Sequence, residues 1–184
     1  MSDGDFKTKC LDIFKSLENQ RNSIFAGLDS LTNEQRHFSP DPEKWNCLQV
    51  LFHLMSAEKF SVIYMKKKTS SGGELPSAGF MSWLRLVTLK IAFRLPYKFK
   101  APSFIDATGK EPEYETLKFD WNNIRADLQD LIKNLDEQTL QGEIFKQPAV
   151  GRMNMKHALQ FMLVHIAHHR EQINRILHHP SFPK

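Results

Sequence analysis

Apolar residues in this chain recur at steps of three and four over long stretches, and this spacing constrains the fold more than any other feature of the sequence. The clearest run lies within residues 115–135, with apolar side chains at Leu117, Trp121, Ile124, Leu128, Leu131 and Leu135. Side chains at these steps lie on one face of an α-helix, which has to be buried against other elements. Sustained alternation of period two, which would indicate strands, does not occur in the sequence. The sequence therefore predicts an all-α protein.

The same spacing predicts three more long helices, over residues 5–28, from residue 47 to between 64 and 68, and over residues 155–177. Asn46 and Gln49 have the spacing of a capping box at the start of the second main helix, and Asn154 can cap the last. A loop is expected before that last helix. Four long amphipathic helices favour a four-helix bundle. The connection between the second and third main helices is long, so the pattern leaves open whether the two are non-adjacent or parallel.

An inserted segment, at about residues 74–112, separates the second and third main helices. Within it, residues 80–93 are predicted to be helical, with an apolar side formed by Phe80, Trp83, Leu84, Val87 and Ile91. No Asp or Glu occurs from Leu75 to Ile105, and the cations of this stretch account for the whole net charge of +4.

The basic part of the insert, residues 76–105, has two interpretations. The first, which we prefer, is a lid packed across the mouth of the bundle with its lysines in water. The second is a cationic amphipathic stretch that lies on an anionic membrane or on a partner. Arg85, Lys90 and Arg94 interrupt the apolar residues too often for the segment to span a bilayer, so no transmembrane segment is expected.

Length, cysteine content and charge restrict the class of protein. With 184 residues the chain is expected to form a single domain, residues 1–184. Cys10 and Cys47 provide no disulfide framework, and the first residues, MSDGDFKTK, do not resemble a signal peptide, so we expect a cytoplasmic location. Charges balance outside the basic insert, which argues against a protein that binds nucleic acid.

Histidines interrupt the apolar face of the last helix, in the run FMLVHIAHHREQI at residues 161–173. His165 and His169 are four residues apart and therefore lie on the same face, in a row with apolar residues. Two stacked imidazoles on a buried face suit a divalent metal, although core histidines that are only hydrogen-bonded are the alternative. His168 lies off this row, which favours a place at the rim of a site over a role as ligand.

A third ligand would have to come from another helix, and His53 is the candidate. It lies halfway along the second main helix among apolar residues, where a lone imidazole has little reason to be. Isolated histidines on two helices that can face one another favour a shared metal site. The metallopeptidase motif H-E-x-x-H is excluded, because Ile166 occupies the position of its glutamate.

Several other residues have a structural interpretation that we prefer. His157 is expected to be a solvated residue of the first turn, although it could approach the mouth of the site. His178 and His179 suit the negative C-terminal end of the last helix. Cys47, in the first turn of its helix, could have a lowered thiol pKa, but a packing cysteine is the better interpretation.

Together these features resemble the DinB/YfiT-like superfamily over nearly the whole chain. The residues that carry the resemblance are Trp45-Asn46, His53-Leu54, Glu58, His165 and His169-Arg170. The resemblance implies a four-helix bundle in which three histidines hold one divalent metal, and it places the ligands at His53, His165 and His169. Zinc or nickel is the expected metal.

The last-helix motif departs from the usual pattern of the family at one position. The family motif is H-R-G-Q, whereas this chain has Glu171 in place of the glycine. The substitution leaves the ligands untouched. It weakens any inference from the family about close helix packing or contacts of a homodimer at this point.

Three histidines leave at least one metal position open, which is typical of catalytic sites. A metal-bound water or thiolate would be deprotonated near neutral pH. Because the family includes thiol-dependent S-transferases and isomerases, the resemblance implies a metal-dependent enzyme acting on a small molecule such as a low-molecular-weight thiol, with thiol transfer ahead of hydrolysis. Glu58 could orient a ligand or relay a proton, or be a solvent-facing residue. The alternatives are a hydrolase and a non-catalytic bundle that serves as a binding or interaction module.

Overall fold

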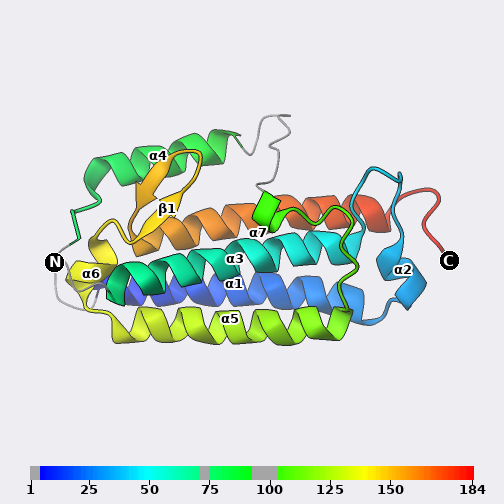
Figure 1. Cartoon of the computed structure of the whole chain (residues 1–184), viewed down its shortest axis with the longest axis horizontal. Helices are drawn as coiled ribbons and strands as arrows, with labels where there is room; N and C mark the ends of the chain where they lie inside the picture. Colours follow the sequence, from blue (N-terminus) through cyan, green and yellow to red (C-terminus); the bar gives the residue numbers. More distant parts are fainter. Residues whose placement is uncertain (1–4, 71–74, 93–102) are drawn as a thin grey trace.

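Four long helices dominate the structure, a computed structural model that describes residues 5–70, 75–92 and 103–184 (Figure 1). The elements, in chain order, are α1 (Asp5–Asp29), α2 (Asn33–His37), α3 (Cys47–Ser70), α4 (Gly79–Ala92), the 3-10 helix η1 (Ser103–Ile105), α5 (Tyr114–Asn134), α6 (Glu137–Gln141), β1 (Phe145–Gln147), β2 (Gly151–Met153) and α7 (Met155–Leu177). Apart from the β1–β2 hairpin, the regular elements of the described residues are helical, so the prediction of an all-α fold is confirmed.

The helices α1, α3, α5 and α7 lie side by side as a four-helix bundle (Figure 1). α1 packs against α5 and α7, and α3 packs against the same two helices, which places α1 and α3 on a diagonal. The chain runs in one direction along α1 and α7 and in the opposite direction along α3 and α5 (Figure 1). The second and third main helices, α3 and α5, are therefore adjacent and parallel.

The starts of α3 and α7 are fixed by the caps that the sequence predicts. The Gln49 N–H donates to Asn46 Oδ1 at 2.9 Å, and the Asn46 N–H donates to Gln49 Oε1 at 3.0 Å, which completes a capping box. The His157 N–H donates to Asn154 Oδ1 at 2.9 Å. These bonds satisfy amide groups that have no partner within the helix. They set the start of the two helices that carry the candidate ligands.

A group of charged side chains, here called the Glu58 cluster, lies inside the bundle between α1, α3 and α5. Arg125 donates from Nε and Nη2 to the two carboxylate oxygens of Glu58, both at 2.7 Å, and Trp121 Nε1 donates to Glu58 Oε2 at 2.7 Å. Arg125 Nη1 also donates to Glu18 Oε1 at 3.1 Å, and Arg21 Nη2 donates to Glu18 Oε2 at 2.8 Å. Two carboxylates and two guanidiniums therefore neutralise one another within the bundle.

Helix α4 lies outside the bundle, against α7 and the β1–β2 hairpin (Figure 1). Its buried side is formed by Leu86, Leu89 and the fully buried Ser82. The side predicted to be apolar faces outward, and Phe80 is 69% exposed. The helix has apolar residues on two sides, and spacing alone does not choose between them.

The segment expected to be a loop before α7 forms α6 and the hairpin instead. The strands pair antiparallel, with Phe145 opposite Met153 and Gln147 opposite Gly151. Gly151 has a φ of 101°, a conformation that favours glycine and that reverses the chain at this point. Strands of three residues are too short to show alternation in the sequence, which is why the hairpin was not predicted.

Part of the insert cannot be compared with the expectation. Residues 93–102, which include Arg94, Lys98 and Lys100, lie outside the described residues, and with them part of the segment 76–105 that is expected to form a lid. Within the described ranges, no helix has both the length and the apolar content needed to cross a membrane.

Candidate metal centre

His53, His165 and His169 meet between α3 and α7, the antiparallel neighbours in the bundle. One ring nitrogen of each lies within 4.8 Å of the corresponding nitrogens of the other two. His53 Nε2 and His165 Nε2 are 3.2 Å apart. The ring centroids of His165 and His169, one helical turn apart on α7, are separated by 4.8 Å. The three residues that the sequence singled out are thus brought together by the fold.

These distances suit a single small cation. Bonds of about 2.0–2.1 Å to one ion place two ligand nitrogens about 2.9–3.4 Å apart, for angles between octahedral and tetrahedral. The separation of 3.2 Å between His53 Nε2 and His165 Nε2 falls in this range. The His169 ring has its centroid 4.7 Å from that of His53, and one of its nitrogens lies within 4.8 Å of those of the other two histidines.

The opposite ring nitrogens of two histidines are held by hydrogen bonds. His53 Nδ1 lies 2.9 Å from the carbonyl oxygen of Ile105 in η1. A carbonyl oxygen only accepts, so Nδ1 donates and the lone pair of the neutral ring is on Nε2. His169 Nδ1 lies 2.8 Å from Gln172 Oε1, which fixes the second ring in the same way. Both rings therefore keep the lone pair of Nε2 available to a metal, with its direction set by a second residue.

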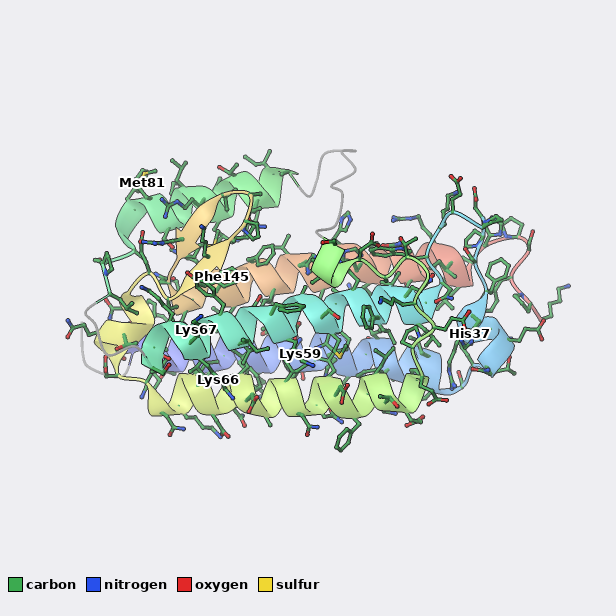
Figure 2. The ribbon with its side chains drawn as sticks, viewed as in Figure 1. His37, Lys59, Lys66, Lys67, Met81 and Phe145 are labelled. Atoms are coloured by element: carbon green, nitrogen blue, oxygen red, sulfur yellow. The ribbon has the colours of Figure 1, made fainter. Side chains whose placement is uncertain are left out.

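Aromatic side chains enclose the histidines. The indole of Trp45 lies 5.1 Å from the His53 ring, and Phe161 stacks on His165 with centroids 5.6 Å apart. Phe161 in turn stacks on Phe145 of the hairpin, a residue labelled in Figure 2. Trp45 Nε1 donates to Thr108 Oγ1 at 3.2 Å, which connects the indole beside His53 to the segment after η1.

Burial keeps the three imidazoles neutral. It is the largest cause of a lowered pKa for each ring, and proximity to the other rings adds to it for His165 and His169. The pKa of His169 falls to about 3, and that of His165 lies well below its usual range. Neutral imidazole is the form that binds metal, because a protonated ring has no free lone pair. The donor set, its neutral state and its spacing all fit a divalent metal.

Glu58 lies inside the bundle, where it faces α5. It is 3% exposed, so the solvent-facing interpretation is wrong. Its carboxylate is bound by Arg125 and Trp121 of α5. The sequence signal for this pair is Arg125 itself, which lies one turn after Trp121 on the apolar face of α5 and requires a buried partner.

His157 was expected to be solvated, and this is wrong. It is 7% exposed, and its Nδ1 lies 2.6 Å from Ser82 Oγ of α4. Ser82 Oγ also accepts the N–H of Asn154 at 3.2 Å. Burial, with repulsion from Lys156 and Lys90, lowers the pKa of His157 to about 4. The residue is a neutral contact between α4 and α7.

The remaining candidates lie where the structural interpretations put them. Cys47 is fully buried, and burial raises its thiol pKa to about 12, so the packing interpretation holds and activation by the helix start does not. His168 is exposed beside His169, with ring centroids 5.1 Å apart. His178 is exposed, and its Nδ1 lies 2.8 Å from the Asn174 carbonyl at the end of α7.

Comparison with known proteins gives one match. A sequence model described as the DinB superfamily matches residues 16–173, a range that contains His53, His165 and His169. No curated protein matches the chain, and neither does any solved structure.

Proposed function

The chain belongs to the DinB superfamily, and we propose that His53, His165 and His169 bind one divalent metal, zinc or nickel, at which the protein acts on a small molecule. The observation that carries the proposal is the convergence of three neutral imidazoles from α3 and α7 on one point. In His53 and His169 the Nδ1 atom is hydrogen-bonded, which leaves Nε2 of each ring as the free nitrogen. Histidines that only fill space in the core do not require this shared arrangement.

When bound, the metal would supply a Lewis acid with an open coordination position, which lowers the pKa of a thiol or water placed there. The chain contributes the rest. Ile105 and Gln172 hold two rings in their binding tautomer. Trp45 and Phe161 cover the rings with apolar surface and restrict access of water to them.

Metal content tests the first part of the proposal. Untagged wild-type protein is expected to contain one divalent metal per chain by elemental analysis. His53→Ala is expected to lose it, because two ligands from one helix make a weak site. His168→Ala and His178→Ala serve as matched controls that leave the metal content unchanged, since both side chains are exposed and outside the cluster. Stoichiometric metal in folded His53→Ala would contradict the three-histidine site.

We place thiol transfer ahead of hydrolysis as the reaction, on the strength of the family resemblance. Metal-loaded protein is then expected to conjugate a small thiol to an electrophile faster than metal-free protein, and His165→Ala is expected to abolish the difference. A panel of small thiols and esters, run on both forms, measures it. Turnover of esters without thiols would favour a hydrolase instead. Absence of metal-dependent turnover with either class would favour a non-catalytic binding module.

A further inference from the structure

The outward side of α4 is an apolar surface of five residues, here called the outer face of α4: Phe80, Met81, Trp83, Leu84 and Ile91. Their exposed fractions run from 40% for Leu84 to 69% for Phe80. The rings of Phe80 and Trp83 pack on each other with centroids 5.2 Å apart. Figure 2 shows Met81 projecting from α4 on the side away from the bundle. A contiguous apolar surface of this kind marks an interaction site.

Cations border this surface. At about 100° per residue, Arg85 and Lys90 lie on opposite edges of the outer face of α4. The helix contains no acidic residue. Glu143, close to α4, is held by Arg85 at 3.4 Å and by Arg152 at 3.5 Å, so its charge is neutralised.

The charge of the chain is also distributed unevenly along the sequence. Residues 75–105 and 144–170, which include α4, the hairpin and most of α7, contain nine of the 25 Lys and Arg residues and none of the 21 Asp and Glu residues. The remainder of the chain therefore carries a charge of −5. The hairpin contributes exposed Lys146 and Arg152, which are opposite each other in its register and lie next to α4.

We propose that the outer face of α4 binds an anionic lipid surface. A helix with Trp, Phe and Leu on one side and Lys or Arg along its edges lies in the interface of a bilayer, with the apolar side chains below the headgroups and the cations at the phosphates. α4 has this arrangement, and its other side is anchored to α7 and the hairpin by Leu86, Leu89 and Ser82. The protein therefore binds with α4 folded in place.

The charge around α4 favours an anionic bilayer over a second copy of the chain as the partner. Two copies meeting through α4 would bring Arg85, Lys90, Lys146 and Arg152 of both together. Glu143 offsets one of these four charges in each copy, and the excess of like charge disfavours the interface. An anionic bilayer supplies the opposite charge over the same area. The proposal does not depend on the metal site, since the three histidines lie between α3 and α7.

Co-flotation of the metal-loaded full chain with lipid vesicles tests the proposal. We expect binding to vesicles of phosphatidylcholine with phosphatidylglycerol, little binding to phosphatidylcholine alone, and weakening by salt. The double variant Phe80→Ser/Trp83→Ser is expected to bind at least about tenfold more weakly. Phe119→Ser is the matched control, because Phe119 is 66% exposed on α5 and its loss is expected to change nothing. Circular dichroism checks that each variant is folded.

A charge reversal gives a second, independent arm. Lys90→Glu is expected to weaken binding to the anionic vesicles roughly tenfold, and Lys59→Glu, an exposed lysine of α3, is expected to leave it unchanged. Failure of the wild type to float with anionic vesicles would overturn the proposal, as would equal losses in Phe119→Ser or Lys59→Glu. Self-association that Phe80→Ser/Trp83→Ser abolishes, without vesicle binding, would make a second copy the occupant and also overturn it.

Discussion

Among the buried polar residues of helix α3, His53 and Glu58 lie five positions apart, and their surroundings differ. Glu58 faces α5, where Arg125 occupies both its carboxylate oxygens at 2.7 Å. His53 faces α7, where it meets two more neutral imidazoles. The first group contains opposite charges that cancel. The second contains three side chains of one kind, each with a lone pair to offer.

This difference distinguishes a structural cluster from the proposed metal site on the same helix. In a buried ion pair with good geometry, each charge is satisfied by its partner within the fold. Its main effect on stability appears when one partner is removed. Converging neutral imidazoles each keep a lone pair that a bound cation can accept. Burial is similar in the two cases, 3% exposure for Glu58 and 4% for His53, so burial alone does not identify the site. The complementarity of the neighbours does.

The strongest contrast is expected from removing the central residue of each cluster. Glu58→Ala should lower the free energy of unfolding by about 3–5 kcal/mol, because it leaves the Arg125 charge buried without its main partner. His53→Gln in metal-free protein should cost about 1 kcal/mol or less, because a neutral polar side chain replaces another. Urea unfolding in the presence of chelator measures both. Equal losses would mean that the histidines are as structural as the ion pair.

His157 is also a buried histidine, but its partner is Ser82 and not another imidazole. It therefore tests whether a buried histidine outside the cluster has a purely structural role. The pKa of His157 is about 4 in the folded protein, whereas the ordinary pKa of a histidine is 6.5. The unfolded chain therefore binds more protons between these values, and roughly 3 kcal/mol of stability that is present above pH 6.5 is lost as the pH falls towards 4. His157→Gln should flatten the dependence of the melting temperature on pH in this window.

A histidine that is exposed in the folded protein provides the control for this titration. His37→Gln, at the exposed end of α2 (Figure 2), is the matched variant against which the melting curves of His157→Gln are compared. An unchanged slope in His157→Gln would show that burial does not hold the ring neutral.

The sequence predicted the histidine site better than the ion pair, for a physical reason. His165 and His169 are related by helical spacing, which the sequence displays, and His53 was conspicuous among apolar neighbours. The partner of Glu58 lies 67 residues further along the chain, and that pairing depends on α3 and α5 being parallel neighbours, which the spacing left open. Contacts between distant segments are not encoded in local periodicity.

The same limit applies to α4. Its outer face and its packed side are both apolar, so the sequence predicted the helix but not its orientation. The burial of His157 follows from that orientation, since Ser82 on the packed side covers the ring. A prediction that α4 packs on the outside of the bundle would have given both the orientation of α4 and the burial of His157.

Metal addition should stabilise one cluster and leave the other unaffected. At a free metal concentration of one hundred times the Kd, the free energy of unfolding of the wild type should rise by about 2.7 kcal/mol. Glu58→Gln should gain the same increment, because its carboxylate bonds to α5 and is not one of the ligands. His53→Gln should gain little. Thermal unfolding with and without metal measures the three increments, and loss of the increment in Glu58→Gln would link the two clusters.

The smallest effect is expected from the residue that orients His169. Gln172 accepts from His169 Nδ1 at 2.8 Å, so Gln172→Ala should free the ring to rotate and weaken metal binding about tenfold, equivalent to about 1.4 kcal/mol. Gln172→Glu keeps an acceptor at this position and should restore the affinity, which a purely structural role of the amide does not require. Competition with a chelator of known affinity measures these differences. Gln160→Ala, also half-buried on α7, is the control, and an equal loss there would mean that general loosening of α7, and not the orientation of His169, is responsible.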